Sequence, residues 1–281
     1  MAPVKDFINS AVDQQKPFFV WYAPFLPHTP HNPPERILKK YRKDDRHIAE
    51  AKYFAMCDWF DETCGELIDH LDTAGVADNT LIVYVTDNGW IQRTPNTDVP
   101  AGWKPSFAPR SKQSPYEGGT RTPILLSWPG VIEPADRPEV VSSIDLVPTM
   151  LRAAGADVPD GLPGVDLLPV VQNKATLERR HLFGESFAHD VADIDNPQET
   201  LLYRWVIEGK WKLLLTYDGK VNRYKPVHLR EEKRPQLFDL LADPHEKKNL
   251  AAANPDVVAR LATAIQDWWP VTERNVQTTA E

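Results

Sequence analysis

The sequence predicts an α/β fold, in which part of a mostly parallel central sheet flanked by helices is followed by a small C-terminal antiparallel sheet and a terminal helix. Apolar runs without alternation, such as Leu81–Val85, are typical of parallel strands that helices cover on both faces. In the first 175 residues these runs alternate with helical patterns. From residue 176 onward, β-like runs are separated by turn residues. We therefore expect a core domain at 1–175 and a subdomain at 176–281.

The first half of the core contains a strand, a helix and two further strands in chain order. Phe18–Tyr22 is an apolar run that enters the proline-rich loop PFLPHTPHNPP. Residues 50–74 show apolar positions at steps of three and four, which predicts an amphipathic helix that Gly75 ends. Strands 81–85 and TPILLSWPG follow, separated by an irregular loop from about 90 to 116. This order favours parallel pairing.

The predicted helix carries both cysteines, Cys57 and Cys64, on its apolar face. They lie seven residues apart, which separates their Cα atoms by about 10 Å, beyond the reach of a disulfide. We expect two core-facing thiols that pack as small apolar groups. The apolar positions of this face are Tyr53, Cys57, Phe60, Cys64, Leu67 and Leu71.

The second half of the chain begins with the segment SSIDLVPTMLRAAG, which predicts a helix. It starts with capping residues, carries Pro148 in its first turn and closes on Gly155. The segment DGLPGVDLLPVV is typical of a loop, and residues 172–200 form a polar stretch of low periodicity. The runs LYRWVIEGKWKLLLTYDGK and QLFDLLADPHEKKNL predict the antiparallel strands, and residues 255–269 predict the last helix.

The composition is ordinary for a globular protein and excludes some partners. The 281 residues are 42% hydrophobic and 26% charged, with no apolar run long enough to span a membrane. A net charge of −8 argues against a nucleic-acid partner, which would require a basic face. The start MAPVKDFINSAVDQQ lacks the apolar middle of a signal peptide. Composition alone leaves the compartment unknown.

Three loops that follow the predicted core strands carry polar groups suited to chemistry. They hold His28 and His31, then Asp87 and Asn88, and finally Lys112. Ligands of open α/β sheets collect beyond the carboxyl ends of the strands, where these loops would converge. A carboxylate beside an amide carbonyl suits Ca²⁺ or Mg²⁺, whereas histidine and lysine suit an oxyanion and its leaving group.

Each loop taken alone also fits a structural role, and this alternative stays open at the level of single motifs. Asp87 and Asn88 fit a plain turn after a strand. Lys112 fits a solvated lysine, and Glu117 with Arg121 fits a structural ion pair around a glycine turn.

As an ordered set, these motifs resemble the sulfatase family of the alkaline-phosphatase-like superfamily. The family has a Pro-His-x-Pro loop, a strand ending in Thr-Asp-Asn-Gly, and a lysine followed by Glu-Gly-Gly-x-Arg-x-Pro. Here these are Pro27–Pro30, Thr86–Gly89, and Lys112 with Glu117–Pro123. The segments SSIDLVPTMLRAAG and LFDLLADPHEKKNLA also look like the family. The resemblance runs from about Lys16 to Trp269.

The resemblance implies a role for each matching residue. Asp87 and Asn88 would bind the divalent cation, Ca²⁺ or Mg²⁺, that orients the sulfate. Lys112 would contact the sulfate and its bridging ester oxygen, and His28 would give the leaving group a proton. His31 would touch the substrate. The turn from Glu117 to Arg121 would aim Lys112.

Other parts of the family pattern are absent, so the chain looks like the C-terminal portion of a sulfatase. The Cys-x-Pro-x-Arg or Ser-x-Pro-x-Arg motif that yields the formylglycine nucleophile does not occur, and neither Cys57 nor Cys64 fits it. The consecutive metal aspartates are also missing, since Asp44-Asp45 lies in a charged stretch without a strand before it. The tetrapeptide GKWK at 209–212 is interpreted as part of the C-terminal sheet. Formylglycine is therefore expected in a missing N-terminal part, for which a separate chain is one possibility.

The function that the resemblance implies is metal-dependent cleavage of a sulfate ester, with this chain supplying part of the active site. The substrate would be a sulfated small molecule or a sulfated glycan, and the tryptophans and arginines of residues 90–111 suit a sulfated sugar. Two alternatives stay open: a non-catalytic protein that binds sulfated glycans or a partner, and a phosphonate or phosphodiester hydrolase. The family implies a periplasmic or secreted location.

Overall fold

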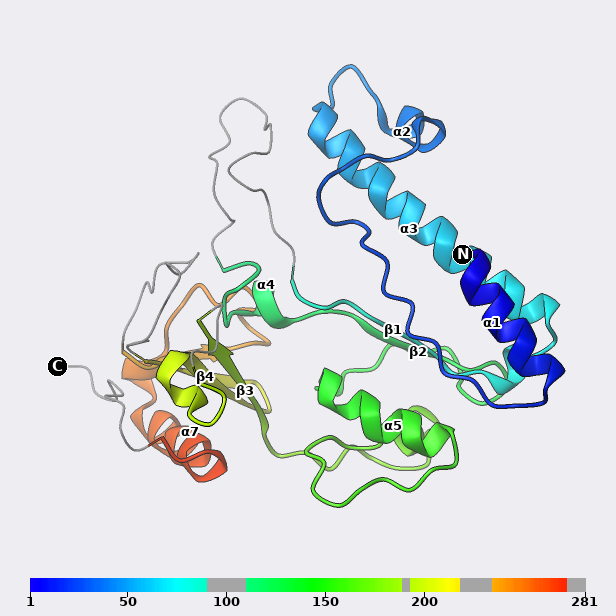
Figure 1. The fold of residues 1–281 in the computed structure, drawn as a ribbon. Helices are drawn as coiled ribbons and strands as arrows, with labels where there is room; N and C mark the ends of the chain where they lie inside the picture. Colours follow the sequence, from blue (N-terminus) through cyan, green and yellow to red (C-terminus); the bar gives the residue numbers. More distant parts are fainter. Residues whose placement is uncertain (90–109, 189–192, 218–233, 272–281) are drawn as a thin grey trace. The chain divides into compact units, whose positions relative to one another are not determined.

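The computed structural model describes residues 1–89, 110–188, 193–217 and 234–271 (Figure 1). These residues form two compact units. Of the described residues, the first unit contains 1–83 and 126–134. The second unit contains 84–89, 110–125, 135–188, 193–217 and 234–271. Within the described residues, no helix combines the length and the apolar composition that crossing a bilayer requires.

Helices dominate the first unit. They are α1 (Ala2–Asp13), α2 (Glu35–Tyr41) and α3 (Ile48–Thr73), followed by the 3-10 turn η1 (Ala77–Asn79). Helix α3 confirms the prediction for residues 50–74. The His47 side chain caps its start by accepting a hydrogen bond from the Ala49 amide, and Gly75 follows its end with a φ of 69°.

The buried face of α3 agrees with the predicted one only at Leu71. Helix α2 packs on α3 through a cluster of buried residues, which are Ile37, Leu38, Ala51 and Ala55. Small residues allow two helix backbones to approach closely, so the alanines and not Tyr53 form the contact. The two cysteines are free thiols but only half-buried, so the prediction of core-facing thiols is correct only in part. Burial raises the pKa of both thiols.

The predicted strand Phe18–Tyr22 is wrong, because residues 16–25 have no regular secondary structure. Phe19 and Trp21 are 69% and 85% exposed. A strand needs a hydrogen-bonded neighbour, and neither sheet of the described residues includes this segment.

Strands β1 (Ile82–Val85) and β2 (Ile124–Ser127) are confirmed and pair with each other. The larger, mostly parallel sheet stays a prediction.

The middle of the second unit is a helix with a buried carboxylate at its start. A 3-10 turn, η2 (Ser143–Asp145), leads into α5 (Leu146–Ala153), which confirms the helix predicted there. Asp145 is fully buried and accepts hydrogen bonds from the amides of Ser142 and Val165 and from Arg179. The predicted loop after α5 ends in one helical turn, α6 (Leu168–Val171).

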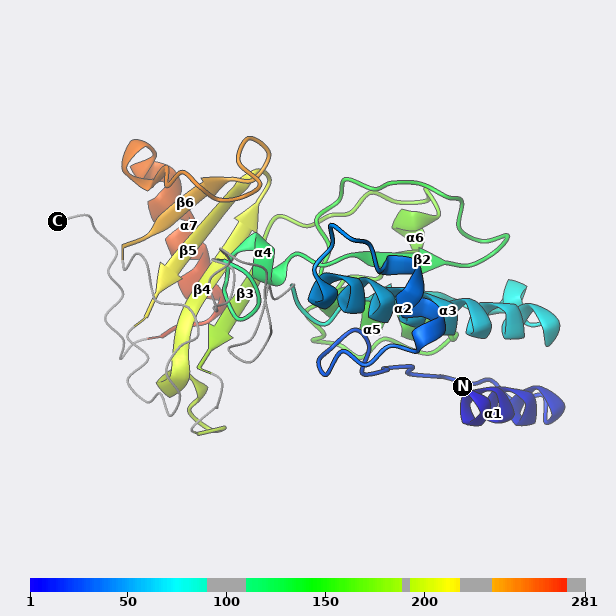
Figure 2. The ribbon, with the colours of Figure 1, turned by 90° about the horizontal axis from the view of Figure 1, so that it is seen from above.

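The C-terminal part of the second unit is a four-stranded antiparallel sheet with a helix on it (Figure 2). The strands are β3 (Leu182–Phe187), β4 (Leu201–Glu208), β5 (Trp211–Thr216) and β6 (Gln236–Asp239), paired in chain order. Helix α7 spans Pro255–Trp268. The single turns η3 (Pro197–Thr200) and η4 (Ala251–Ala253) precede β4 and α7. This confirms the antiparallel sheet and the last helix, whereas β3 lies in the stretch interpreted as irregular. The domain boundary near residue 175 stays a prediction.

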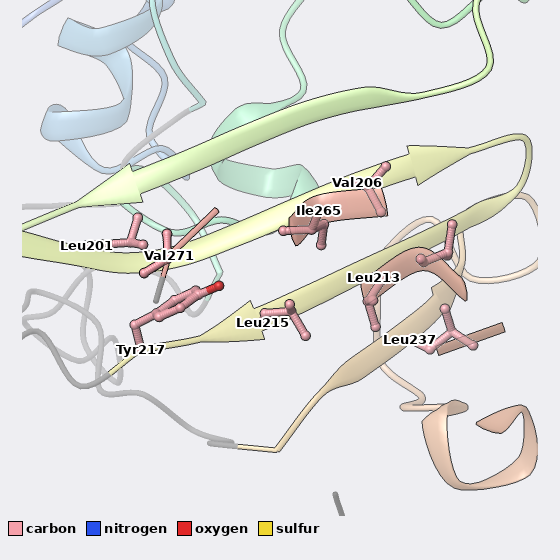
Figure 3. Packing of buried hydrophobic residues seen from close by; sticks show 9 residues of the cluster. Leu201, Val206, Leu213, Leu215, Tyr217, Leu237, Ile265 and Val271 are labelled. Carbon is pink, nitrogen blue, oxygen red and sulfur yellow. The ribbon is translucent and has the colours of Figure 1, made fainter. Parts of the chain in front are cut away.

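Both faces of β5 are covered, which explains its unbroken apolar run. Leu213 and Leu215 join the cluster under α7, with Ile265 among the contributors from the helix (Figure 3). Leu214 joins a second cluster that contains Tyr116. Because side chains alternate along a strand, Lys212 points to the same face as Leu214. Burying one leucine completely contributes about 1.5–3 kcal/mol, so the apolar positions of β5 stabilise both clusters.

Candidate functional site

The turn after β1 brings together two side chains predicted to bind a metal. The Asp87 carboxylate is exposed, and its Oδ1 atom accepts a hydrogen bond of 2.9 Å from the Asn88 amide. The Gly89 amide donates to the Gly119 carbonyl oxygen at 2.9 Å. A carboxylate has about four acceptor positions, so the Asn88 bond leaves capacity for a cation. The turn therefore contains the oxygen-bearing side chains predicted to bind a cation, and its backbone is fixed to a second segment.

That second segment is α4 (Glu117–Thr120), and its glycines permit close backbone contact. A Cβ atom on Gly89 would overlap the Gly118 carbonyl oxygen. A Cβ atom on Gly119 would lie 2.5 Å from the Ser111 carbonyl oxygen. Both positions exclude any side chain, because real Cβ atoms do not approach backbone oxygens so closely. The turn at Asp87, helix α4 and the loop before α4 thus meet backbone to backbone.

The loop before α4 carries Lys112 between two unusual backbone conformations. Arg110 and Gln113 have φ angles of 59° and 69°, in the left-handed region that residues other than glycine rarely adopt. Such conformations persist where the surrounding contacts determine them. Ser111 is buried and Lys112 is half-buried. The structure therefore holds the backbone on both sides of Lys112 in a defined conformation.

The predicted histidine loop lies in the first unit. The peptide bonds before Pro27 and Pro30 are cis. His28 is exposed and its ring centroid lies 4.8 Å from that of Phe25. Its Nδ1 atom is 2.8 Å from the Thr29 carbonyl oxygen. A carbonyl oxygen can only accept, so Nδ1 carries the proton and Nε2 is the basic atom of the neutral ring.

His31 is half-buried beside α3, with its ring centroid 5.8 Å from that of Tyr53. Burial lowers the pKa of His31, and a hydrogen bond with the Pro27 backbone opposes this only in part. The ring is therefore neutral at pH 7. A neutral imidazole can accept a hydrogen bond from a substrate hydroxyl group.

The structure thus joins three of the five predicted site residues, Asp87, Asn88 and Lys112, within one unit. The described residues contain no group of three or more histidine, cysteine, aspartate or glutamate side chains that would hold a metal. Ca²⁺ takes about six to eight oxygen ligands, so Asp87 and Asn88 fit the chemistry of the ion but would supply only part of its shell. The aromatic and basic residues at 90–109 lie outside the described residues.

Sequence reasoning missed two buried charged residues that contact α4. Lys212 on β5 donates to the Glu117 carboxylate at 2.8 Å and lies 3.0 Å from a carboxylate oxygen of Glu246. Glu246 in turn accepts a hydrogen bond of 2.6 Å from the Glu117 amide. Lys212 and Glu246 are 0% and 1% exposed. The sequence contains one signal for this contact, which is the lysine in the apolar strand WKLLLT. Lysine is almost never fully buried unless it is paired, so a buried acidic partner is expected.

Two further contacts tie the Lys112 loop to the C-terminal sheet. The Arg110 guanidinium donates to the Glu246 backbone carbonyl and lies over the Tyr116 ring, 4.4 Å from its centroid. The Tyr116 hydroxyl donates to the Gln236 side chain on β6 at 2.9 Å. The residues on either side of Lys112 are thereby attached to the sheet.

Comparisons with known proteins give concordant matches. The family model described as Sulfatase matches residues 1–156, and the model described as N-sulphoglucosamine sulphohydrolase, C-terminal, matches residues 110–268. The N-acetylgalactosamine-6-O-sulfatase of Bacteroides thetaiotaomicron is 27% identical over 270 residues, covering 93% of this chain and 48% of that protein. Arylsulfatase A of Homo sapiens is 28% identical over 275 residues, covering 93% of this chain and 50% of its own length.

Among solved structures, the crystal structure of Ps i-CgsB superposes with a TM-score of 0.72 at 24% identity. The match covers 97% of this chain and 54% of that one, and it shows a shared α/β fold. The chain spans about half the length of the curated relatives it matches.

Proposed function

This chain belongs to the sulfatase family, and from that premise we propose that it supplies part of the active site of a metal-dependent sulfuric ester hydrolase. The observation that carries the proposal is the Gly89–Gly119 hydrogen bond, which attaches the turn of Asp87 and Asn88 to the helix that follows Lys112. The proposed cation ligands and the proposed lysine thereby belong to one compact unit, which supports a shared role in the cleavage of an anionic ester.

Asp87 and Asn88 are the residues that would hold Ca²⁺ or Mg²⁺, through their side-chain oxygens. When bound, the cation would draw negative charge from the sulfate group. The remaining ligands and the formylglycine nucleophile expected from the family would come from outside this sequence. Such a division fits the pair of oxygen ligands present here, which is too few for a complete calcium shell.

Lys112 would neutralise charge on the sulfate and on the bridging oxygen while the S–O bond breaks. A fixed cation stabilises a developing anion best when it needs no reorganisation, and the defined backbone on both sides of Lys112 supports this role. The role is electrostatic. It does not require Lys112 to release its proton.

His28 would protonate the departing oxygen. Its Nδ1 atom donates to the Thr29 carbonyl oxygen, so a second proton would reside on Nε2 and be delivered from there. His31, which is neutral at pH 7, would accept a hydrogen bond from the alcohol part of the substrate. These two roles complete the assignment of the five candidate residues.

We propose a sulfated glycan or a sulfated small molecule as the substrate. The name of the Bacteroides thetaiotaomicron relative, N-acetylgalactosamine-6-O-sulfatase, supports the glycan class. The name arylsulfatase A of the human relative supports a smaller sulfate ester. We also propose the periplasmic or secreted location that is expected of the family.

The experiment that tests this function uses the protein isolated from its natural source. Native mass spectrometry first establishes which chains accompany these 281 residues and whether formylglycine is present. Hydrolysis of 4-nitrophenyl sulfate is then measured with Ca²⁺, with Mg²⁺ and after chelation. Cation-dependent hydrolysis supports the proposal. Preferential hydrolysis of a phosphonate monoester, or binding of sulfated glycans without hydrolysis, would replace it with one of the two alternatives.

A further inference from the structure

We propose that Lys212 and Glu246 are positioning residues for the candidate site, in that their buried ion pair fixes α4 and, through α4, the backbone that carries Lys112 and the turn of Asp87. The inference deepens the proposed function and rests on it for its catalytic consequence. Its structural part concerns only contacts within the second unit, which can be tested without an activity assay.

The first step is the double attachment of Glu117, the first residue of α4. Its carboxylate accepts from the Lys212 ammonium at 2.8 Å, and its amide donates to the Glu246 carboxylate at 2.6 Å. Lys212 lies on β5 and Glu246 lies in the segment after β6, so α4 is bound both to a strand of the C-terminal sheet and to the segment that follows the sheet. Binding at two atoms fixes both the place and the direction of this short helix.

The second step is the contact from α4 to the site. Gly119 receives the hydrogen bond of Gly89, which follows the two predicted metal ligands. Gly118 packs on the Arg110 carbonyl group and Gly119 on the Ser111 carbonyl group, directly before Lys112. Because these contacts are between backbone atoms, no side chain can change its rotamer to absorb a movement of α4. A displacement of α4 would therefore displace both loops.

The third step is a direct contact that does not pass through α4. The Arg110 guanidinium donates to the backbone carbonyl of Glu246, whose own φ is 54°. Glu246 thus contacts the Lys112 loop with its backbone and α4 with its side chain. Because Glu246 binds both the Lys112 loop and α4, it fixes the position of one relative to the other.

Charge and burial make the contacts of Lys212 and Glu246 with α4 dependent on the Lys212 charge. Two carboxylates share one ammonium group in a region from which water is nearly excluded. Removing the ammonium would leave two like charges facing each other at low dielectric. Burial accordingly raises the pKa of Glu246, and the Lys212 charge only partly opposes this. We therefore expect the loss of the Lys212 charge to drive the two carboxylates apart.

The structural test measures amide hydrogen exchange by NMR on the full chain. The variant Lys212→Met keeps the length of the side chain and removes its charge. We expect exchange of the Gly89, Glu117 and Gly119 amides to accelerate about tenfold or more. The Leu214 amide in the sheet should change less than about twofold. Lys210→Met is the matched control, because exposed Lys210 pairs with Asp239 at 2.7 Å and should leave all four amides unchanged.

Glu246→Gln is the second variant, which decides the matter if Lys212→Met does not fold. Its amide oxygen can still accept from Glu117, while the charge is lost. The same three amides should accelerate selectively. Unchanged exchange at these amides, or equal acceleration at Leu214, would overturn the proposal, because the pair would then be inert or would stabilise the whole sheet.

The catalytic consequence is tested with a double-mutant cycle in the active protein from its natural source. We expect Lys212→Met to lower kcat about tenfold with little change in KM, and to have almost no further effect in a Lys112→Ala background. A purely structural role gives additive losses in the two backgrounds and would overturn the assignment. If Lys112→Ala itself leaves the rate unchanged, the proposed function fails, while the exchange result still decides whether the pair positions α4.

Discussion

The loop that carries Lys112 and the loop that carries His28 differ in what fixes their backbone. Around Lys112 the fixing contacts are backbone packing at glycines and buried charges on the C-terminal sheet. Around His28 they are local: the His28 amide donates to the Phe25 carbonyl oxygen at 2.9 Å, and the His28 ring contacts Phe25 and bonds to the neighbouring residue, in an exposed segment. The Lys112 loop is therefore fixed by long-range buried contacts, which suits the proposed electrostatic role, whereas the His28 loop is fixed by local contacts at the surface, which suits the proposed transfer of a proton.

We expect the largest loss of activity from a substitution of Lys112, whose loop is fixed by buried long-range contacts. We expect Lys112→Ala to lower turnover of 4-nitrophenyl sulfate by on the order of a hundredfold or more, comparable to the loss of one oxyanion-stabilising group. The matched control is Lys174→Ala, on an exposed lysine of the same unit. Steady-state kinetics on the cation-loaded protein from its natural source make the measurement. An unchanged rate would remove Lys112 from the site.

The His28 loop should show an effect that depends on the leaving group. A general acid contributes about 10²-fold or more when the departing oxygen needs a proton. We therefore expect His28→Ala to slow hydrolysis of an alkyl sulfate about a hundredfold and that of 4-nitrophenyl sulfate much less, since nitrophenolate leaves unaided. Equal losses with both substrates would contradict proton donation by His28.

Backbone packing at the glycines can be tested by stability. Gly119→Ala places a Cβ 2.5 Å from two backbone oxygens and should destabilise the second unit by about 1–3 kcal/mol. The contrasting variant is Gly65→Ala in α3, where a Cβ meets nothing within 4 Å. Replacing a helical glycine there should stabilise the first unit by about 0.5–1 kcal/mol. Urea denaturation followed by circular dichroism distinguishes the two signs.

The smallest effect concerns two carboxylates of the second unit with opposite pKa shifts. Burial raises the pKa of Glu246 from 4.5, so the folded state keeps a proton that the unfolded chain has released. Its contribution to stability therefore decreases as pH rises from 4.5 through the raised pKa. Burial also acts to raise the pKa of Glu208, but hydrogen bonds from Arg180 and Arg260 outweigh it and lower that pKa.

The contribution of Glu208 consequently has the opposite sign: it is present above pH 4.5 and is lost as pH falls through the lowered pKa. We expect Glu246→Gln to remove the decrease with rising pH, and Glu208→Gln to remove the loss on acidification. Denaturation midpoints between pH 3 and pH 7, a range chosen to bracket an ordinary carboxyl group at about 4.3, make the comparison. The same pH profile in both variants would contradict the assignment.

Local sequence patterns determined most of the elements of this protein. The steps of three and four over residues 50–74 and the capping residues before Leu146 each act within a few neighbours along the chain, and the structure contains both features. The order of the Pro-His-x-Pro, Thr-Asp-Asn-Gly and Glu-Gly-Gly motifs likewise indicates the family without reference to the fold.

Tertiary structure decided what depends on a distant partner. Phe18–Tyr22 has a strand-like sequence, but pairing requires a neighbouring strand that the described residues do not provide. The buried face at the start of α3 is the one on which α2 packs. It consists of alanines and leaves Tyr53 exposed. Glu117 meets Lys212 and Glu246 across 95 and 129 residues of sequence. Burial and charge pairing are properties of such long-range contacts, so only the folded chain shows that the C-terminal sheet holds the loop of Lys112.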